Sequence, residues 1–135
     1  MPLHYSMQAI VEKEDVKIDF YKALGPLINS ECIFASNTSS LAISNMAIAS
    51  GRPDRFVGLH FFNPVQVMKL VEVISTSHTD PAVTQLITEF GKRIGKVTVN
   101  CGDTPGFIVN RLLVPFLAQV CYFEVSLFAK GSAMR

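Results

Sequence analysis

The sequence lacks the features that mark several classes of protein. Its 135 residues contain no tryptophan, and twelve basic against eleven acidic residues leave a formal net charge of only +1. This balance gives no electrostatic reason to expect nucleic acid or an anionic membrane surface as a partner. No run approaches the roughly 20 apolar residues of a membrane-spanning helix, so we expect no membrane span.

Cysteine is also scarce. The three cysteines form no C-x-x-C pair, and an odd number cannot all pair within one chain. The pattern favours reduced thiols that pack as small hydrophobic residues. The first residues show neither a secretory signal nor the arginine-rich pattern of a mitochondrial transit peptide.

What the sequence does contain predicts an α/β fold. Short apolar runs bounded by turns are typical of strands that are buried on both faces of a sheet. We expect strands at Cys32–Ala35, Phe56–Phe62, Leu70–Ile74 and Val97–Asn100, and helices at Glu14–Ile28, Ile43–Ala49, Pro81–Ile94 and from about Gly106 onward. This alternation predicts a mostly parallel sheet, whereas residues Met1–Gln8 show no clear pattern.

Polar residues follow three of the predicted strands. They are Asn37–Ser40, His60 with Asn63, and Asp103 with Thr104. In open α/β sheets ligands bind beyond the carboxyl ends of the strands, so we expect these groups to lie together there.

Glu72 lies in an apolar strand between Val71 and Val73. A buried carboxylate needs a partner, and His60 on the preceding strand is the obvious one because consecutive strands are usually neighbours. A histidine held by a carboxylate is a general-base arrangement. Spacing alone leaves open the alternative of a hydrogen-bonded core histidine and a glutamate that faces solvent.

Four segments resemble the 3-hydroxyacyl-CoA dehydrogenase family, in its order and at its spacing, within about Ala9–Gln119. They read SNTSSL at 36–41, DRFVGLHFFNPV at 54–65, MKLVEVI at 68–74 and DTPGFIVNRLLVP at 103–115. That family oxidises L-3-hydroxyacyl-CoA to 3-ketoacyl-CoA with NAD in fatty-acid β-oxidation, and close relatives act on 3-hydroxybutyryl-CoA.

The resemblance implies roles for individual residues. His60 would be the base that takes the proton of the substrate hydroxyl, and Glu72 would orient His60 and balance its charge. Ser39 and Asn110 would hydrogen-bond the reacting oxygens of the substrate. The residues implied to contact or position NAD are Glu12, Lys17, Asn37, Ser39 and Asn63. No metal-ligand set is predicted.

The sequence also departs from the family, whose chain begins with a strand, a G-x-G-x-x-G turn and a helix that receives the cofactor pyrophosphate. Here no two of the eight glycines are spaced as G-x-G, and Leu3–Gln8 does not match the family's apolar strand. The resemblance therefore predicts an internal fragment with a partial Rossmann-like, doubly wound sheet. Residues 1–103 would be the C-terminal portion of the NAD-binding domain, and residues 104–135 would begin a helical substrate and dimerisation domain.

Two functions stay open at this point. The first is NAD-dependent oxidation of L-3-hydroxyacyl-CoA, which the family places in homodimers of the mitochondrial matrix. We expect little or no activity from 135 residues that lack the glycine loop. The second is a non-catalytic family member that binds a full-length dehydrogenase subunit through Leu112, Leu113, Phe116 and Leu117. The intact His60 and Glu72 argue against a third, purely structural role.

Overall fold

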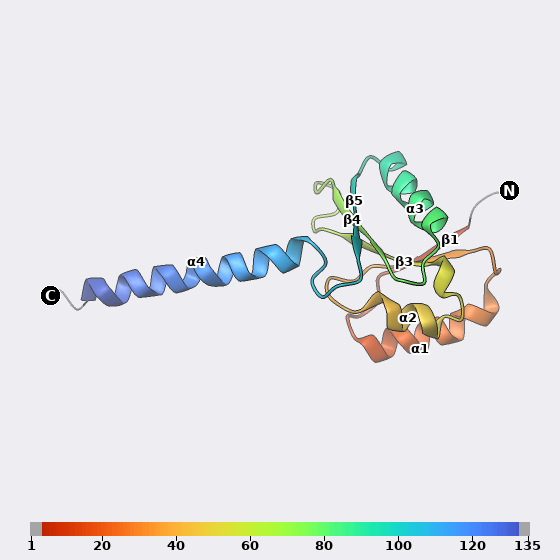
Figure 1. The fold of residues 1–135 in the computed structure, drawn as a ribbon, viewed down its shortest axis with the longest axis horizontal. Coiled ribbons are helices and arrows are strands. Elements are labelled where there is room, and N and C mark those ends of the chain that lie inside the picture. Colours follow the sequence, from red (N-terminus) through yellow and green to blue (C-terminus); the bar gives the residue numbers. More distant parts are fainter. Residues whose placement is uncertain (1–3, 133–135) are drawn as a thin grey trace.

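The fold is a five-stranded sheet with helices on both faces and one helix that projects from it (Figure 1). The computed structural model describes residues 4–132. The strands lie in the order β1 (Tyr5–Gln8), β2 (Ile33–Ser36), β3 (Phe56–Phe61), β4 (Leu70–Ser75) and β5 (Val97–Gly102). Neighbouring strands are parallel except for the antiparallel pair β3 and β4. The predicted mostly parallel sheet is confirmed.

Helices α1 and α2 cover one face of the sheet, and α3 covers the other (Figure 1). The helices are α1 (Glu14–Leu24), α2 (Ile43–Ala49), α3 (Pro81–Arg93) and α4 (Val109–Ser132), with 3₁₀ turns at Gly25–Leu27 and Pro53–Arg55. As its sequence predicts, α3 begins at a cap, since the Asp80 carboxylate accepts a 2.8 Å hydrogen bond from the Ala82 N–H. It ends before Gly95, whose φ of 79° favours glycine.

Strand β1 is the element that the sequence pattern does not predict. Tyr5–Gln8 pairs in parallel with β2, although its residues are neither uniformly apolar nor alternating. It lies at the edge of the sheet, where backbone hydrogen bonds to one neighbour suffice to define a strand. Gln8, its one buried residue, donates from Nε2 to Ser36 Oγ at 2.5 Å. Met1–Leu3 lie outside the described residues.

Two hydrophobic clusters divide along the two faces of the sheet. The cluster between the sheet and helices α1 and α2 includes Tyr21, Phe34, Ile43, Phe56 and Ile74. The cluster between the sheet and α3 is formed by Ile33, Ala35, Val57, Leu59, Val71, Val73, Val83 and Ile87. Because side chains alternate along a strand, Glu72 shares the first face with Ile74.

Gly58 lets α2 approach the sheet closely. A Cβ at this position would lie 2.8 Å from Ile43 Cδ1 and 2.9 Å from Ile74 Cβ, closer than carbon atoms pack. The absence of a side chain on β3 therefore brings the start of α2 directly over β3 and β4. This approach positions the loop before α2 next to the end of β3.

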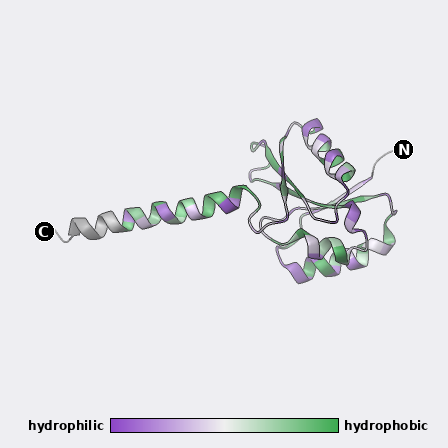
Figure 2. Cartoon of the chain, viewed as in Figure 1, coloured by the Kyte–Doolittle hydropathy of each residue, from purple (hydrophilic) through white to green (hydrophobic). Residues whose placement is uncertain are grey.

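Helix α4 extends away from the sheet, and hydrophobic stretches recur along it (Figure 2). Its exposed large hydrophobic residues are Leu112, Leu113, Val114, Phe116, Leu117, Val120, Tyr122, Phe123 and Val125. Within residues 4–132, no helix is long and apolar enough to cross a membrane.

Candidate active site

His60 and Glu72 face each other across the antiparallel pair β3 and β4. They occupy opposed positions in the register, and His60 Nδ1 lies 2.7 Å from Glu72 Oε2. The side chain of His60 is 6% exposed and that of Glu72 is fully buried. The predicted pairing is confirmed. An ionised carboxylate only accepts hydrogen bonds, so beside it the neutral form of His60 carries its proton on Nδ1 and keeps on Nε2 the lone pair that a base needs.

The second oxygen of Glu72 is also satisfied. Glu72 Oε1 accepts hydrogen bonds from the N–H groups of Ile108 and Val109, each at 2.9 Å, where α4 begins. Ile108 has no side-chain oxygen with which to cap this helix, so Glu72 supplies the cap from β4. Thus one buried carboxylate both fixes the tautomer of His60 and anchors α4 to the sheet.

Aromatic rings limit the space around His60. Its ring centroid lies 4.4 Å from that of Phe62 and 5.9 Å from that of Phe107. Phe107 is buried and adopts a φ of 50°, a left-handed conformation that is uncommon outside glycine. The turn at Phe107 thereby delivers one aromatic ring to the imidazole and the next two N–H groups to Glu72.

Glu12 and Lys17 hold the loop that follows β2. Glu12 Oε1 accepts hydrogen bonds from Thr38 Oγ1 and, at 2.9 Å, from the Ser39 N–H. Lys17 Nζ lies 3.1 Å from Glu12 Oε2 and donates to the Asn37 carbonyl at 2.7 Å. The Lys17 side chain is fully buried, whereas that of Glu12 is 41% exposed. In this structure Lys17 therefore contacts the loop and Glu12, and only Glu12 has surface to offer to a ligand.

The loop itself reaches β3 and α4. Asn37 Oδ1 accepts a hydrogen bond from the Phe61 N–H at 3.1 Å, next to His60. Asn110 Nδ2 donates to the Ser39 carbonyl at 3.0 Å, and the Ser39 side chain is exposed. Ser39 and Asn110 are thus brought together. Asn63 is exposed in the turn after β3, at a cis bond to Pro64, and the structure does not join it to the loop.

The expectation that Asp103 joins this group is wrong. Strand β4 is antiparallel to β3, and β5 is parallel to β4. The carboxyl end of β5 therefore lies beside the amino end of β3, at the other end of the strands from His60 and the loop after β2. Asp103 instead caps α2, accepting from the N–H groups of Ile43 at 2.9 Å and Ser44 at 2.8 Å. Thr104 is exposed beside it.

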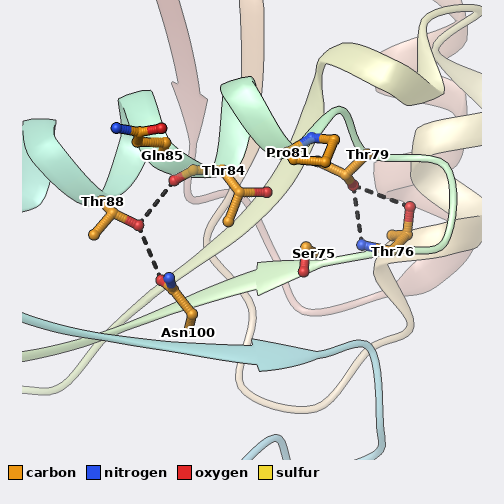
Figure 3. Close-up of a pocket in the computed structure, with 8 residues that line it drawn as sticks. All are labelled: Ser75, Thr76, Thr79, Pro81, Thr84, Gln85, Thr88 and Asn100. Carbon is orange, nitrogen blue, oxygen red and sulfur yellow. Dashed lines mark hydrogen bonds between the residues drawn. The ribbon is translucent and has the colours of Figure 1, made fainter.

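A separate polar pocket of about 420 Å³ lies under the other face of the sheet, between α3 and the ends of β4 and β5 (Figure 3). Hydroxyl and amide groups line it, and Thr88 Oγ1 joins the Thr84 carbonyl to Asn100 Oδ1. Its lining carries no charged side chain and no histidine that could activate a hydroxyl. Within residues 4–132, no cluster of three His, Cys, Asp or Glu side chains could hold a metal ion. We therefore take the surroundings of His60, rather than this pocket, as the candidate active site.

The carboxyl group of Glu12 makes stability depend on pH. Burial alone would raise its pKa, but the hydrogen bonds from Thr38 and Ser39 and the ammonium of Lys17 lower the pKa below the ordinary value of 4.5. A folded-state pKa below the unfolded one adds stability above the unfolded pKa, and this stability is lost as the pH falls through the folded value. We expect Glu12→Gln to be less stable at neutral pH and to lose less stability on acidification.

Urea denaturation at a series of acidic pH values measures this effect. Asp19→Asn is the matched control, since Asp19 is an exposed acid on α1 that makes none of these contacts. Parallel loss of stability in the wild type and in Glu12→Gln would contradict the assignment.

Comparison with known proteins agrees with this geometry. Residues 4–104 match the family model described as "3-hydroxyacyl-CoA dehydrogenase, NAD binding domain". The chain belongs to this family. The human protein named "Hydroxyacyl-coenzyme A dehydrogenase, mitochondrial" is 50% identical over 129 residues, which cover 96% of this chain and 40% of that protein. A probable 3-hydroxybutyryl-CoA dehydrogenase from Deinococcus radiodurans is 47% identical over 120 residues, covering 87% of this chain and 43% of that protein.

A solved structure of the 3-hydroxyacyl-CoA dehydrogenase group shows the same architecture. The crystal structure of (S)-3-hydroxybutyryl-CoA dehydrogenase from Ralstonia eutropha superposes with a TM-score of 0.86 at 36% identity. The match covers 91% of this chain and 44% of that one. The predicted Rossmann-like fold is therefore confirmed, and the chain spans less than half the length of the relatives it matches.

Sequence reasoning misses two parts of the site of this dehydrogenase-family chain. The first is the pair of backbone N–H groups at Ile108 and Val109, which have no side-chain signature. The second is the role of Thr38, which lies in the predicted polar group Asn37–Ser40 and whose hydroxyl joins Glu12 to the loop. An apolar residue at the cap position of α4 is a signal for the first, because a helix with no cap of its own needs an acceptor from elsewhere.

Proposed function

We propose that this chain forms the catalytic part of an NAD-dependent dehydrogenase that oxidises L-3-hydroxyacyl-CoA to 3-ketoacyl-CoA in fatty-acid β-oxidation. The observation that carries the proposal is the buried pair of His60 and Glu72, joined at 2.7 Å next to the loop of Asn37 and Ser39. The printed names of the relatives, hydroxyacyl-CoA and 3-hydroxybutyryl-CoA dehydrogenases, support the substrate class.

His60 Nε2 accepts the proton of the substrate hydroxyl while the hydrogen on the same carbon leaves as hydride. NAD, when bound, supplies the hydride acceptor, so the products are the ketone, NADH and a proton. Glu72 stabilises the positive charge that His60 gains, because its Oε2 is already in place at 2.7 Å. Ser39 and Asn110 hold the substrate oxygens, and their hydrogen bond through the Ser39 carbonyl supports this shared role.

The residues present fit only part of the cofactor. Four of them lie beyond the carboxyl ends of β1, β2 and β3, where α/β sheets bind nucleotides, namely Glu12, Asn37, Ser39 and Asn63. We propose that they hold the nicotinamide end of NAD and that Lys17 acts through Glu12 and Asn37. No glycines are spaced as G-x-G to receive the pyrophosphate. We therefore expect little or no turnover from the 135 residues alone.

Two assays test the proposal. Absorbance of NADH with acetoacetyl-CoA or a 3-hydroxyacyl-CoA measures turnover of the chain itself, and a rate near that of a full-length relative would overturn the expected deficit. Residues 9–119 are then grafted over the matching segment of the human relative, which supplies the remaining sequence. We expect the graft to retain dehydrogenase activity. A folded graft that binds NAD but transfers no hydride would overturn the function.

We further propose how the chain divides into domains and in which compartment it acts. Residues 1–103 would complete an NAD-binding domain, and residues 104–135 would begin a helical domain for substrate and dimer contacts; the family match at 4–104 supports this boundary. The first and last three residues of this division lie outside the described part of the chain. The human and pig relatives, both named mitochondrial, support a place in the mitochondrial matrix.

The exposed surface of α4 favours a second candidate function, a non-catalytic chain that binds a full-length dehydrogenase subunit. Leu112 and Phe116 are 69% and 61% exposed, and Leu113 and Leu117 lie on the same helix. Exposed apolar surface of this kind marks interaction sites. Co-purification of this chain with a full-length subunit, without activity in the graft, would favour this function over the first.

A further inference from the structure

Glu72 links two elements of the structure that sequence reasoning treats separately. Its Oε2 contacts His60 Nδ1 at 2.7 Å, while its Oε1 receives the N–H groups of Ile108 and Val109 at 2.9 Å each. The carboxylate is fully buried, so water does not replace either contact. Three hydrogen bonds to two oxygens fix both its position and its rotation.

We propose that the first turn of α4 is a positioning element for His60, which acts through Glu72 and sets how strongly the imidazole holds a proton. Its meaning for catalysis rests on the proposed function, but the linkage itself does not. The N–H groups at a helix start carry partial positive charge, and they draw negative charge toward Oε1. Oε2 then attracts the proton on His60 less strongly than an unanchored carboxylate would.

No other charged contact competes for Glu72 among the described residues. On β5, burial first, and then the charges of Glu72 and Asp103, raise the pKa of Cys101 to about 11, so this thiol stays neutral near neutral pH. Asp103 directs both oxygens to the start of α2. Arg111 on α4 is exposed, and the Glu12–Lys17 pair is joined to the loop after β2. The N–H groups at the start of α4 are therefore the groups that compete with His60 for the negative charge of the Glu72 carboxylate.

A backbone ester at residue 109 tests the linkage with little change in shape. Supplying residue 109 as the α-hydroxy analogue of valine replaces its N–H, which makes no intrahelical bond at the first position of α4, by an ester oxygen. The ester removes one donor from Oε1 and adds no atom between residue 109 and Glu72. We expect the midpoint of the His60 imidazole titration, followed by NMR, to rise, because Oε2 then keeps more of the negative charge.

Val109→Ala is the matched control, since it shortens the side chain but keeps the N–H. Its midpoint should equal that of the wild type. The exposed residues His4 and His78 report any general effect of either substitution. A wild-type midpoint in the ester chain, with unchanged circular dichroism, would overturn the proposal.

A second measurement needs no substitution at α4. If Glu72 relays charge between the two groups, the amide protons of Ile108 and Val109 in the wild-type chain shift with the same midpoint as His60. In His60→Gln this shift should disappear. Amide signals that do not change as His60 titrates would overturn the proposal even if the ester chain fails to fold. Both measurements use the chain without cofactor or substrate, so their outcome is independent of whether turnover is observed.

Discussion

Replacing His60 with Gln in the active graft should reduce kcat by about 10³-fold, within the range that a positioned general base contributes. Glutamine is close to histidine in size and can still donate to Glu72, so the packing against Phe62 and Phe107 is largely kept. It has no titratable nitrogen, however, to take the proton of the substrate hydroxyl. Stopped-flow absorbance of NADH under saturating substrate measures the loss directly.

The affinity for NAD should be unchanged in this variant, because His60 contributes the proton acceptor and the proposed cofactor contacts come from other residues. His78→Gln is the matched control, since His78 is exposed on the loop before α3 and should keep full activity. If His60→Gln lowered kcat less than tenfold, the role of His60 as base would be contradicted.

The pairing of His60 with Glu72 could be predicted because two simple rules agree on it. Apolar runs place both residues in buried strands, and a carboxylate inside such a strand needs a partner on its neighbour. The structure places them in opposed register positions. The family resemblance then raises this pair from a possible core contact to a catalytic one, although the catalytic role itself stays a prediction.

The misplaced Asp103 shows where the same reasoning fails. The rule that ligands lie beyond the carboxyl ends of strands assumes that the strands are parallel, and β4 reverses direction. The sequence did carry a signal for this reversal. The link from Phe61 to Leu70 has no helix and is shorter than the dozen or more residues that a parallel crossover needs. Length of the connection, rather than hydrophobic pattern, decides the direction of β4.

Strand β1 could not be found from pattern at all. An edge strand owes its place to hydrogen bonds with one neighbour, and those bonds leave no trace in the order of side chains. The caps of α2 and α4 are similar, since Asp103 and Glu72 lie far along the chain from the helix starts they hold. Only their apolar cap residues, Ala42 and Ile108, signal that an outside acceptor is needed.

Glu72→Gln should reduce kcat of the graft by roughly 10³-fold, although the substitution keeps the shape of the side chain. An amide has one acceptor oxygen, and the N–H groups of Ile108 and Val109 both require an acceptor. The amide oxygen therefore stays at the α4 side, and the NH₂ group faces His60. Nδ1 of His60 must then accept, which moves the ring proton to Nε2 and removes the lone pair that the substrate hydroxyl needs.

Nitrogen NMR of His60 distinguishes this cause from simple loss of structure, because a protonated Nε2 and an unprotonated Nδ1 give separate signals. We expect the wild type to carry its proton on Nδ1 and Glu72→Gln to carry it on Nε2, with unchanged helix content. Glu89→Gln is the matched control on exposed α3 surface and should leave both the tautomer and the rate unchanged. A Glu72→Gln chain that keeps the Nδ1 proton would show that the amide has turned its oxygen to His60, and that the first turn of α4 does not dictate how residue 72 faces the imidazole.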